Sequence, residues 1–373
     1  MRTYHVYARC NLPHGVCPYC GHVSRSVHSR YHRTIADLSI LGHPVIITFE
    51  ARKFFCHNPD CRKKTFAEQP GDEVFRYRRR TRRCEMAVTQ HGLKCSSESA
   101  RKLLSATGVP LSGDTVLRDI HRMSVPERCE VKEIGVDDWA FRKGVTYGSI
   151  IVSLETGSVI DLLGDRDVKS FQAWLDEHVQ VEVVSRDRST DYTAAIAATG
   201  RNITEVADRF HLSMNMSDCV TKVIGSHYDE YRSAVRPEEV QETPEVDSDK
   251  SIRKEKMVHA EVALVEKMMP YGWFRDIYNA ASSFYATIMG NDIDELDSWL
   301  DSYGKSPIKE LRSFAYGIRM DLKAVRNAIS LDTSNGIVEG FVNKLKAVKR
   351  VMFGRASLDL LKRKMVFSDL CFN

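Results

Sequence analysis

The chain has 373 residues, of which 43% are hydrophobic and 28% charged, with a formal net charge of +4. These values are typical of a soluble globular protein with two or three domains. No apolar run is long enough to span a membrane, and residues 1–6 do not begin a secretory signal. We therefore expect a cytoplasmic protein whose ten cysteines do not form a disulfide framework.

Charge is distributed unevenly along the chain. Residues 1–130 carry 22 Lys/Arg against 12 Asp/Glu, residues 131–335 carry 24 against 35, and residues 336–373 carry 8 against 3. A basic head, an acidic middle and a basic tail predict contacts with a polyanion at both ends. Metal-binding acids are expected between them.

Two close cysteine pairs lie near the start of the chain, Cys17 with Cys20 and Cys56 with Cys61. Four thiolates in two such pairs are a common ligand set for a structural zinc ion. Alternating apolar residues over 45–49 predict a β-hairpin between the pairs, so we interpret residues 1–72 as a zinc ribbon. A histidine could replace one thiolate, and the candidates are His14, His22 and His57.

An arginine-rich segment follows, with six arginines in eight residues. Guanidinium groups at this density predict contacts with DNA phosphates, although a solvated linker can have the same composition. The arginines are Arg76, Arg78, Arg79, Arg80, Arg82 and Arg83.

Residues 73–130 have the pattern of a helix-turn-helix DNA-binding domain. Two helical stretches precede a break at Gly108, and Ser112 is placed to cap a third helix. We expect this third helix to enter the DNA major groove, although an ordinary pair of packed helices has the same pattern. The outward side chains of the third helix are Thr115, Arg118 and Arg122.

Residues 131–214 predict the first part of a ribonuclease H-like catalytic domain of α/β class. The expected order is three strands, a helix, a strand, a helix and a strand. We expect the strands at 133–141, 147–154, 159–163, 181–187 and 204–207, and the helices around 171–175 and 192–198.

Carboxylates interrupt or close the apolar strands of this domain, at Asp137 and Asp187. A buried carboxylate is costly unless it is paired, hydrogen-bonded or bound to a metal. With Glu339 from a later helix, these acids could hold two Mg²⁺ (or Mn²⁺) ions. Asp138 and Asp191 are alternative ligands, and acids at strand ends can also simply cap helices.

Glu339 belongs to a helix that we expect from about residue 336 onward, after a turn formed by Ser, Asn and Gly. Asn343, Lys346 and Arg350 follow it at helical spacing, so they share its face. One acid followed by an amide and two cations suits a metal beside a DNA phosphodiester. A solvated basic helix with an incidental glutamate is the alternative.

Residues 215–332 read as a helical insertion in the catalytic domain, and residues 333–373 as the final helices of that domain. We expect helical structure over 215–234 and an acidic linker over 237–245. Aromatic residues of the later helices should be core, with Trp299 as a candidate for stacking on a displaced DNA base. The basic tail around 362–367 should pack on the sheet and contact DNA.

In these features the chain resembles the bacterial insertion-sequence transposases of the ISL-three family, which are DDE transposases. The resemblance rests on the paired cysteines, the helix-turn-helix and the motifs at 134–138, 141–144, 185–187, 207–211 and 334–346. It implies that Asp137, Asp187 and Glu339 are the catalytic triad, and it favours Asp137 over Asp138.

Asp208 and His211 resemble the acid-x-x-His signature that lies beside the active site in several DDE groups. A satisfied core histidine is the alternative for His211. The resemblance further implies Mg²⁺-dependent cleavage and transfer of double-stranded DNA, with terminal inverted repeats and target DNA as partners. It also implies a homo-oligomer, a dimer on DNA, at the bacterial nucleoid. A non-catalytic DNA-binding regulator built from the same N-terminal domains is the alternative function.

Overall fold

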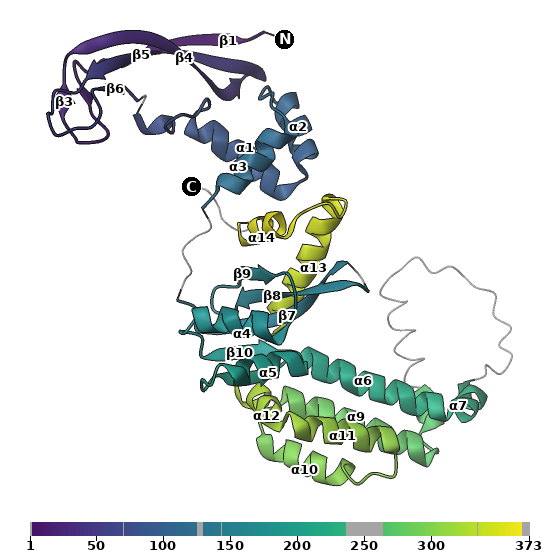
Figure 1. Ribbon diagram of the computed structural model, residues 1–373. Coiled ribbons are helices and arrows are strands. Elements are labelled where there is room, and N and C mark those ends of the chain that lie inside the picture. The colour runs from purple at the N-terminus through teal and green to yellow at the C-terminus, as the bar shows by residue number, and fades with distance from the viewer. Residues whose placement is uncertain are drawn as a thin grey trace, which may run out of the picture. The chain divides into compact units, whose positions relative to one another are not determined.

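The computed structural model describes residues 2–69, 71–124, 130–142, 144–235, 264–333 and 335–367. The chain divides into two compact units, Met1–Glu127 together with Lys344–Asn373, and Arg128–Asn343 (Figure 1). Among the predicted motifs, Lys143, Ser334 and the acidic linker 237–245 lie outside the described residues.

The first unit begins with a small β domain. Its strands are β1 (Tyr4–Arg9), β2 (Gly15–Val16), β3 (Val23–Ser24), β4 (Val27–Ile40), β5 (His43–Phe55) and β6 (Thr65–Ala67). β4 and β5 form a long antiparallel hairpin, β1 and β6 also pair with β5, and β2 and β3 form a separate two-stranded sheet. Leu41 and Gly42 connect β4 to β5 with φ values of 52° and 73°, which a two-residue hairpin turn requires. The hairpin expected between the two cysteine pairs is therefore present.

Three helices follow, at the positions expected from the sequence. They are α1 (Arg82–Lys94), α2 (Ser97–Ala106) and α3 (Gly113–Arg122). Each begins after a hydroxyl side chain that accepts a backbone hydrogen bond, and for α3 this cap is the predicted Ser112. A Cβ at Gly92 of α1 would lie 2.4 Å from Val116 Cγ1, so only glycine lets α1 and α3 approach this closely.

The last helix, α14 (Leu358–Val366), also belongs to the first unit. It contacts α1 and α3, and its Lys364 is buried. Our expectation that the tail packs on the sheet is wrong, because the buried ammonium of Lys364 finds its hydrogen-bond acceptors at the end of α1.

The second unit contains a five-stranded sheet in the order β11-β10-β7-β8-β9. Its strands are β7 (Glu133–Arg142), β8 (Thr146–Ser153), β9 (Ser158–Leu163), β10 (Val183–Arg186) and β11 (Thr204–Ala207). Neighbours among β7, β8 and β9 are antiparallel, whereas β10 pairs parallel with both β7 and β11. Helices α4 (Val168–Glu177) and α5 (Thr190–Ala198) share a buried core with these strands. The predicted order of strands and helices is present.

A group of helices after β11 forms a second core in this unit. They are α6 (Arg209–Ser226), α9 (Gly272–Met289), α10 (Ile293–Tyr303), α11 (Lys309–Met320) and α12 (Leu322–Ser330). The short helix α7 (Tyr228–Val235) follows α6 and contacts it. The helical structure expected over 215–234 is present as two helices, α6 and α7. The first begins earlier than expected, because Asp208 caps it, and it ends before His227.

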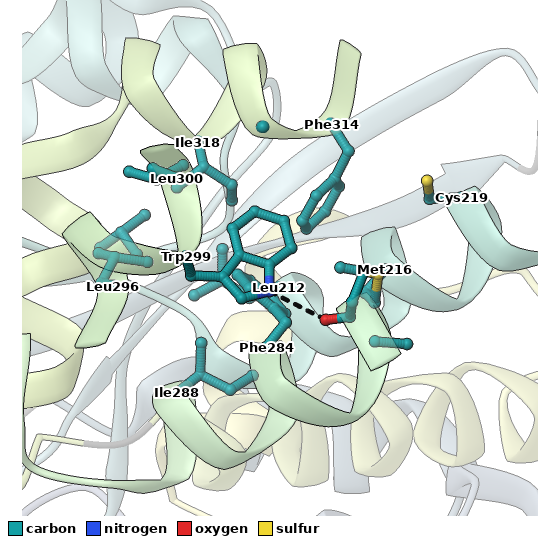
Figure 2. Packing of buried hydrophobic residues seen from close by; sticks show 14 of the residues in the cluster. Leu212, Met216, Cys219, Phe284, Ile288, Leu296, Trp299, Leu300, Phe314 and Ile318 are labelled. Carbon is teal, nitrogen blue, oxygen red and sulfur yellow. Dashed lines mark hydrogen bonds between the residues drawn. The ribbon is translucent and has the colours of Figure 1, made fainter. Parts of the chain in front are cut away.

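Trp299 lies in the centre of this helical core (Figure 2). Its side chain is 4% exposed, and its indole N–H donates to the Ala280 carbonyl at 2.9 Å. Its ring packs against Phe284 and Phe314, with centroid distances of 5.0 and 5.9 Å. The suggestion that Trp299 stacks on a displaced base is therefore wrong, because the ring is enclosed by protein.

One continuous helix, α13 (Gly336–Val351), follows the helical core and carries Glu339 in its first turn, as expected. Among all the helices that the structure describes, none has the combination of length and hydrophobicity needed to cross a bilayer.

Candidate catalytic and zinc sites

The four predicted zinc ligands meet in the first unit. The sulfur atoms of Cys17, Cys20, Cys56 and Cys61 all lie within 4.8 Å of one another. The Sγ–Sγ distance is 4.0 Å between Cys17 and Cys61 and 3.6 Å between Cys20 and Cys56. In a tetrahedral site with Zn–S bonds of about 2.3 Å, the sulfurs are about 3.8 Å apart. The donor atoms and their spacing therefore fit one zinc ion.

Local backbone structure brings these thiols together. Cys17 and Cys20 lie in the connection between β2 and β3, where the Cys17 N–H donates to the His22 carbonyl at 2.8 Å. Cys56 directly follows β5 and donates its N–H to the Lys64 carbonyl at 2.8 Å. A hydrogen bond with the His22 backbone lowers the pKa of Cys20 to about 7, whereas burial raises the pKa of Cys56 to about 12. Cys20 is therefore the thiol of this pair that ionises more readily, and a bound cation would favour the thiolate of both.

Histidines do not take part in this cluster. His14, His22 and His57 were alternative ligands, but the four cysteines are the only closely gathered group of metal-binding side chains among the described residues. The ligand set is therefore the four thiols.

The two predicted aspartates lie on neighbouring parallel strands of the second unit. β10 pairs with β7 so that Ser185 lies opposite Gly135. Asp137 follows Gly135 by two residues in β7, and Asp187 follows Ser185 by two residues, directly after β10. Since side chains alternate along a strand, both aspartates extend from the face that bears Gly135 and Ser185. The topology thus brings Asp137 and Asp187 together.

The alternative ligand Asp138 has other hydrogen-bond partners, although its charge also raises the pKa of Asp137 and Asp187. Asp138 accepts a hydrogen bond of 2.7 Å from the buried Tyr192 hydroxyl of α5, and Arg166 donates to its other oxygen at 2.8 Å. Asp191 lies in the first turn of α5, and its charge acts on the same Arg166. Because Asp138 already has a cation and a hydroxyl as partners, the geometry favours Asp137 as the metal ligand.

Partial burial disfavours the charged forms of Asp137 and Asp187 and so raises the pKa of both. The pKa of Asp137 is raised to about 6, chiefly by burial, and the charge of Asp187 adds to the rise while His211 opposes it. Burial also raises the pKa of Asp187. Two neighbouring carboxylates that resist ionisation are stabilised in their charged form by a bound cation. Such perturbed pairs occur often at functional sites.

Asp208 and His211 lie beside this pair at the start of α6. Asp208 is buried, accepts from the Phe210 N–H at 2.9 Å, and has its other oxygen 2.7 Å from His211 Nδ1. This hydrogen bond raises the pKa of His211, and the charges of Asp137 and Asp187 add to the effect. The side chain of His211 is half-buried.

Glu339 lies next to the sheet, but its side chain is not in close contact with both Asp137 and Asp187. A Cβ at Gly135 would lie 2.4 Å from both Asn335 Oδ1 and Val338 Cγ2, so the start of α13 packs directly on β7. Glu339 is the next residue after Val338 and is half-buried. The side-chain oxygens of Glu339, Asp137 and Asp187 are not all within 4.8 Å of one another.

The roles of Arg186 and Arg188, which flank Asp187, were not predicted from the sequence. Arg186 is 1% exposed and forms ion pairs of 2.6 Å with Glu205 and 2.8 Å with Asp321. Arg188 donates to a backbone carbonyl in α11. Both side chains tie the end of β10 to the helical core, and so they fix the backbone that carries Asp187. A buried arginine needs a carboxylate partner. The position of Arg186 at the end of an apolar strand could therefore have indicated a buried ion pair.

The predicted DNA-contacting arginines divide into two groups. Arg83 forms a bidentate pair with Asp37 of β4, and Arg80 pairs with Asp119 of α3. Arg78 lies 3.6 Å from Glu85 of α1. These three arginines hold the hairpin and the helices together. The arginines that are exposed without such a pair among the described residues are Arg76, Arg79 and Arg82.

The other predicted DNA contacts lie on two helices. On α3, Arg118 and Arg122 are exposed, whereas Thr115 is half-buried and its hydroxyl lies 2.9 Å from that of Ser112. On α13, the exposed residues on the face of Glu339 are Asn343, Lys346 and Arg350. Their contacts with DNA remain predictions.

Comparison with known proteins identifies the family of this chain. A family model described as a transposase, for DDE transposases of the ISL3 type, matches residues 134–365. A second model, described as the zinc-finger of transposase IS204/IS1001/IS1096/IS1165, matches residues 13–61. The transposase for insertion sequence element IS1001 of Bordetella parapertussis is 19% identical over 372 residues, covering 95% of this chain and 88% of that protein. Since the first model spans more than half of the chain, this protein belongs to the ISL3 family of DDE transposases.

Proposed function

We propose that this chain cleaves and joins DNA with Asp137, Asp187 and Glu339 as the ligands of two Mg²⁺ (or Mn²⁺) ions. The observation that supports this most directly is the half-buried aspartate pair at neighbouring parallel strands, with the pKa of Asp137 raised to about 6. Carboxylate oxygens are the ligands that Mg²⁺ prefers. The sheet order, with three antiparallel strands followed by two parallel ones, supports a ribonuclease H-like fold for this domain.

The side chains around the scissile phosphate have different proposed roles. When bound, Mg²⁺ supplies an activated nucleophile and stabilises the leaving oxygen. Asp137 and Asp187 provide two adjacent negative charges, and Asp208 orients His211 beside them. Glu339, in the first turn of α13, supplies the third carboxylate. Its support is the packing of the preceding Val338 on Gly135, two residues before Asp137.

The proposed partners are the terminal inverted repeats of the element and the target DNA. The third helix, α3, reads the major groove, and the exposed arginines Arg76, Arg79 and Arg82 contact phosphates. Along α13, the exposed Asn343, Lys346 and Arg350 hold the strand near Glu339. A dimer of the chain, with each copy bound to one end, is the proposed active form.

Isosteric substitution of each acid tests the catalytic assignment. Asp137→Asn, Asp187→Asn and Glu339→Gln should each lower Mg²⁺-dependent cleavage of labelled end DNA by more than about 100-fold. End binding should change little. Asp138→Asn is the matched control, because its oxygen can still accept from Tyr192, and it should retain cleavage within several-fold. Substantial cleavage by all three variants would rule the scheme out.

Joining needs a separate assay, because a nuclease that never joins would also depend on these acids. Labelled ends are incubated with the protein, Mg²⁺ and a plasmid, and any junctions are sequenced. A non-catalytic regulator would bind the ends and leave them uncut under all of these conditions. That alternative is not favoured, because the transposase family match covers the catalytic region as well as the N-terminal domains.

A further inference from the structure

The feature that carries this inference is the buried lysine of α14. Lys364 is 2% exposed, and its ammonium donates to the carbonyls of Gly92, Leu93 and Cys95. The bonds to Leu93 and Cys95 are 3.3 and 2.8 Å long. These carbonyls lie at the C-terminal end of α1 and in its connection to α2. The last carbonyls of a helix lack partners within it and carry partial negative charge, so a cation there is stabilising.

Two further contacts join α14 to the end of α3. Arg363 donates to the carbonyl of Met123, which caps α3, at 2.6 Å. Asp359 lies 2.8 Å from His121 Nδ1 in the last turn of α3. The tail helix therefore contacts the C-terminal ends of both α1 and α3. All of these residues belong to the first unit, although about 240 to 270 positions separate them in the chain.

Gly92 connects the buried lysine to the packing of α3. Its carbonyl accepts from Lys364, and a Cβ at Gly92 would lie 2.4 Å from Val116 of α3. The lysine thus fixes the backbone segment of α1 against which α3 rests. Burial lowers the pKa of Lys364 to about 8, so the ammonium remains the main form at pH 7.

We propose that α14 completes the DNA-recognition domain, with Lys364 as a positioning residue that sets the placement of α3. The proposal rests on the proposed function of α3 in reading the transposon ends. Lys364 does not contact DNA in this scheme, because it is enclosed between helices. It acts on sequence-specific recognition, whereas the exposed arginines provide sequence-independent affinity for phosphates.

The test measures specificity with the full-length protein. Lys364→Met keeps the length of the side chain but leaves three buried carbonyls without their donor. Its affinity for end DNA should fall about tenfold or more, while its affinity for unrelated DNA and the salt dependence of that binding stay within about twofold. Lys364→Arg restores a cationic donor and should recover a large part of the specificity. Lys102→Met removes an exposed lysine from α2 of the same domain and should leave the ratio of the two affinities unchanged.

Zinc content and circular dichroism show whether the variants are folded. Should Lys364→Met fail to fold, Asp359→Asn takes its place, because Asp359 is 53% exposed and its loss breaks only the surface contacts with His121 and Arg363. Its specificity ratio should fall about two- to threefold. Wild-type specificity in folded Lys364→Met, or in Asp359→Asn where that variant is used, would overturn the proposal. A wild-type protein that does not distinguish end DNA from unrelated DNA would instead refute the proposed function of α3.

Discussion

A single methyl group on β7 should disable the enzyme without altering any of its acids. Gly135→Ala places a Cβ 2.4 Å from both Asn335 Oδ1 and Val338 Cγ2, whereas ordinary contacts begin at 3.4 Å. Because Asn335 and Val338 are both buried, their side chains have little room to turn, and we expect the start of α13 to move away by about 1 Å, the difference between these two distances. A displacement of about 1 Å at a catalytic group commonly costs about 100-fold in rate. Overpacking of this kind also costs about 1–3 kcal/mol of stability.

The assay is Mg²⁺-dependent cleavage of labelled end DNA at saturating enzyme, with thermal melting to confirm that the variant is folded. Gly340→Ala is the matched control, since it adds the same methyl to an exposed position of α13 where no atom lies within 4 Å. It should cleave like the wild type. Val338→Ala in the Gly135→Ala background removes one of the two clashing atoms and should recover part of the rate. Cleavage by Gly135→Ala within threefold of the wild type would show that Glu339 is not positioned by this contact.

Three further predictions concern other parts of the chain. Cys56→Ser should lower the zinc content from one ion per chain towards zero and reduce the thermal stability of the ribbon, as measured by metal analysis and melting. Without Mg²⁺, the free energy of unfolding should fall as the pH rises from 3.8 towards about 6, because folded Asp137 keeps a proton that the unfolded chain has released. Asp137→Asn should remove this slope, worth at most about 3 kcal/mol, in urea unfolding at several pH values. Arg79→Ala removes one proposed phosphate contact. It should lower the slope of the logarithm of DNA affinity against the logarithm of salt concentration by about one, with no change in melting temperature. Arg80→Ala should instead destabilise the fold by about 1–3 kcal/mol, because it leaves the buried Asp119 with only its longer, 3.5 Å pair to Arg122.

Elements with strong local signals were predictable from the sequence. The catalytic strands are apolar, short and bounded by turns, and all five occur near their expected positions. The caps of the N-terminal helices were also readable, as at Ser112. The start of α6 was not, because Asp208 follows a strand directly and serves at once as the helix cap and as the partner of His211. The sequence around Asp208 therefore did not show that the helix begins at this residue.

Long-range pairing was beyond the reach of the sequence. Arg80 and Arg83 look identical to Arg79 and Arg82 in an arginine run, and only the fold places Asp119 and Asp37 beside the first two. Lys364 lies in a run of basic residues whose composition indicates a surface, yet its ammonium is buried against α1. The placement of Glu339 relative to the aspartates likewise depends on how α13 packs on Gly135.

The docking of α14 has a consequence for the order of events during synthesis. A ribosome makes α1, α2 and α3 early, but the lysine that closes the end of α1 emerges only with residues 358–366. If α14 completes the DNA-recognition domain as proposed, that domain stays incomplete in the nascent chain until the proposed catalytic residues have also been translated. Chains that stop early, and so lack Glu339, would compete poorly with intact copies for the ends of the element.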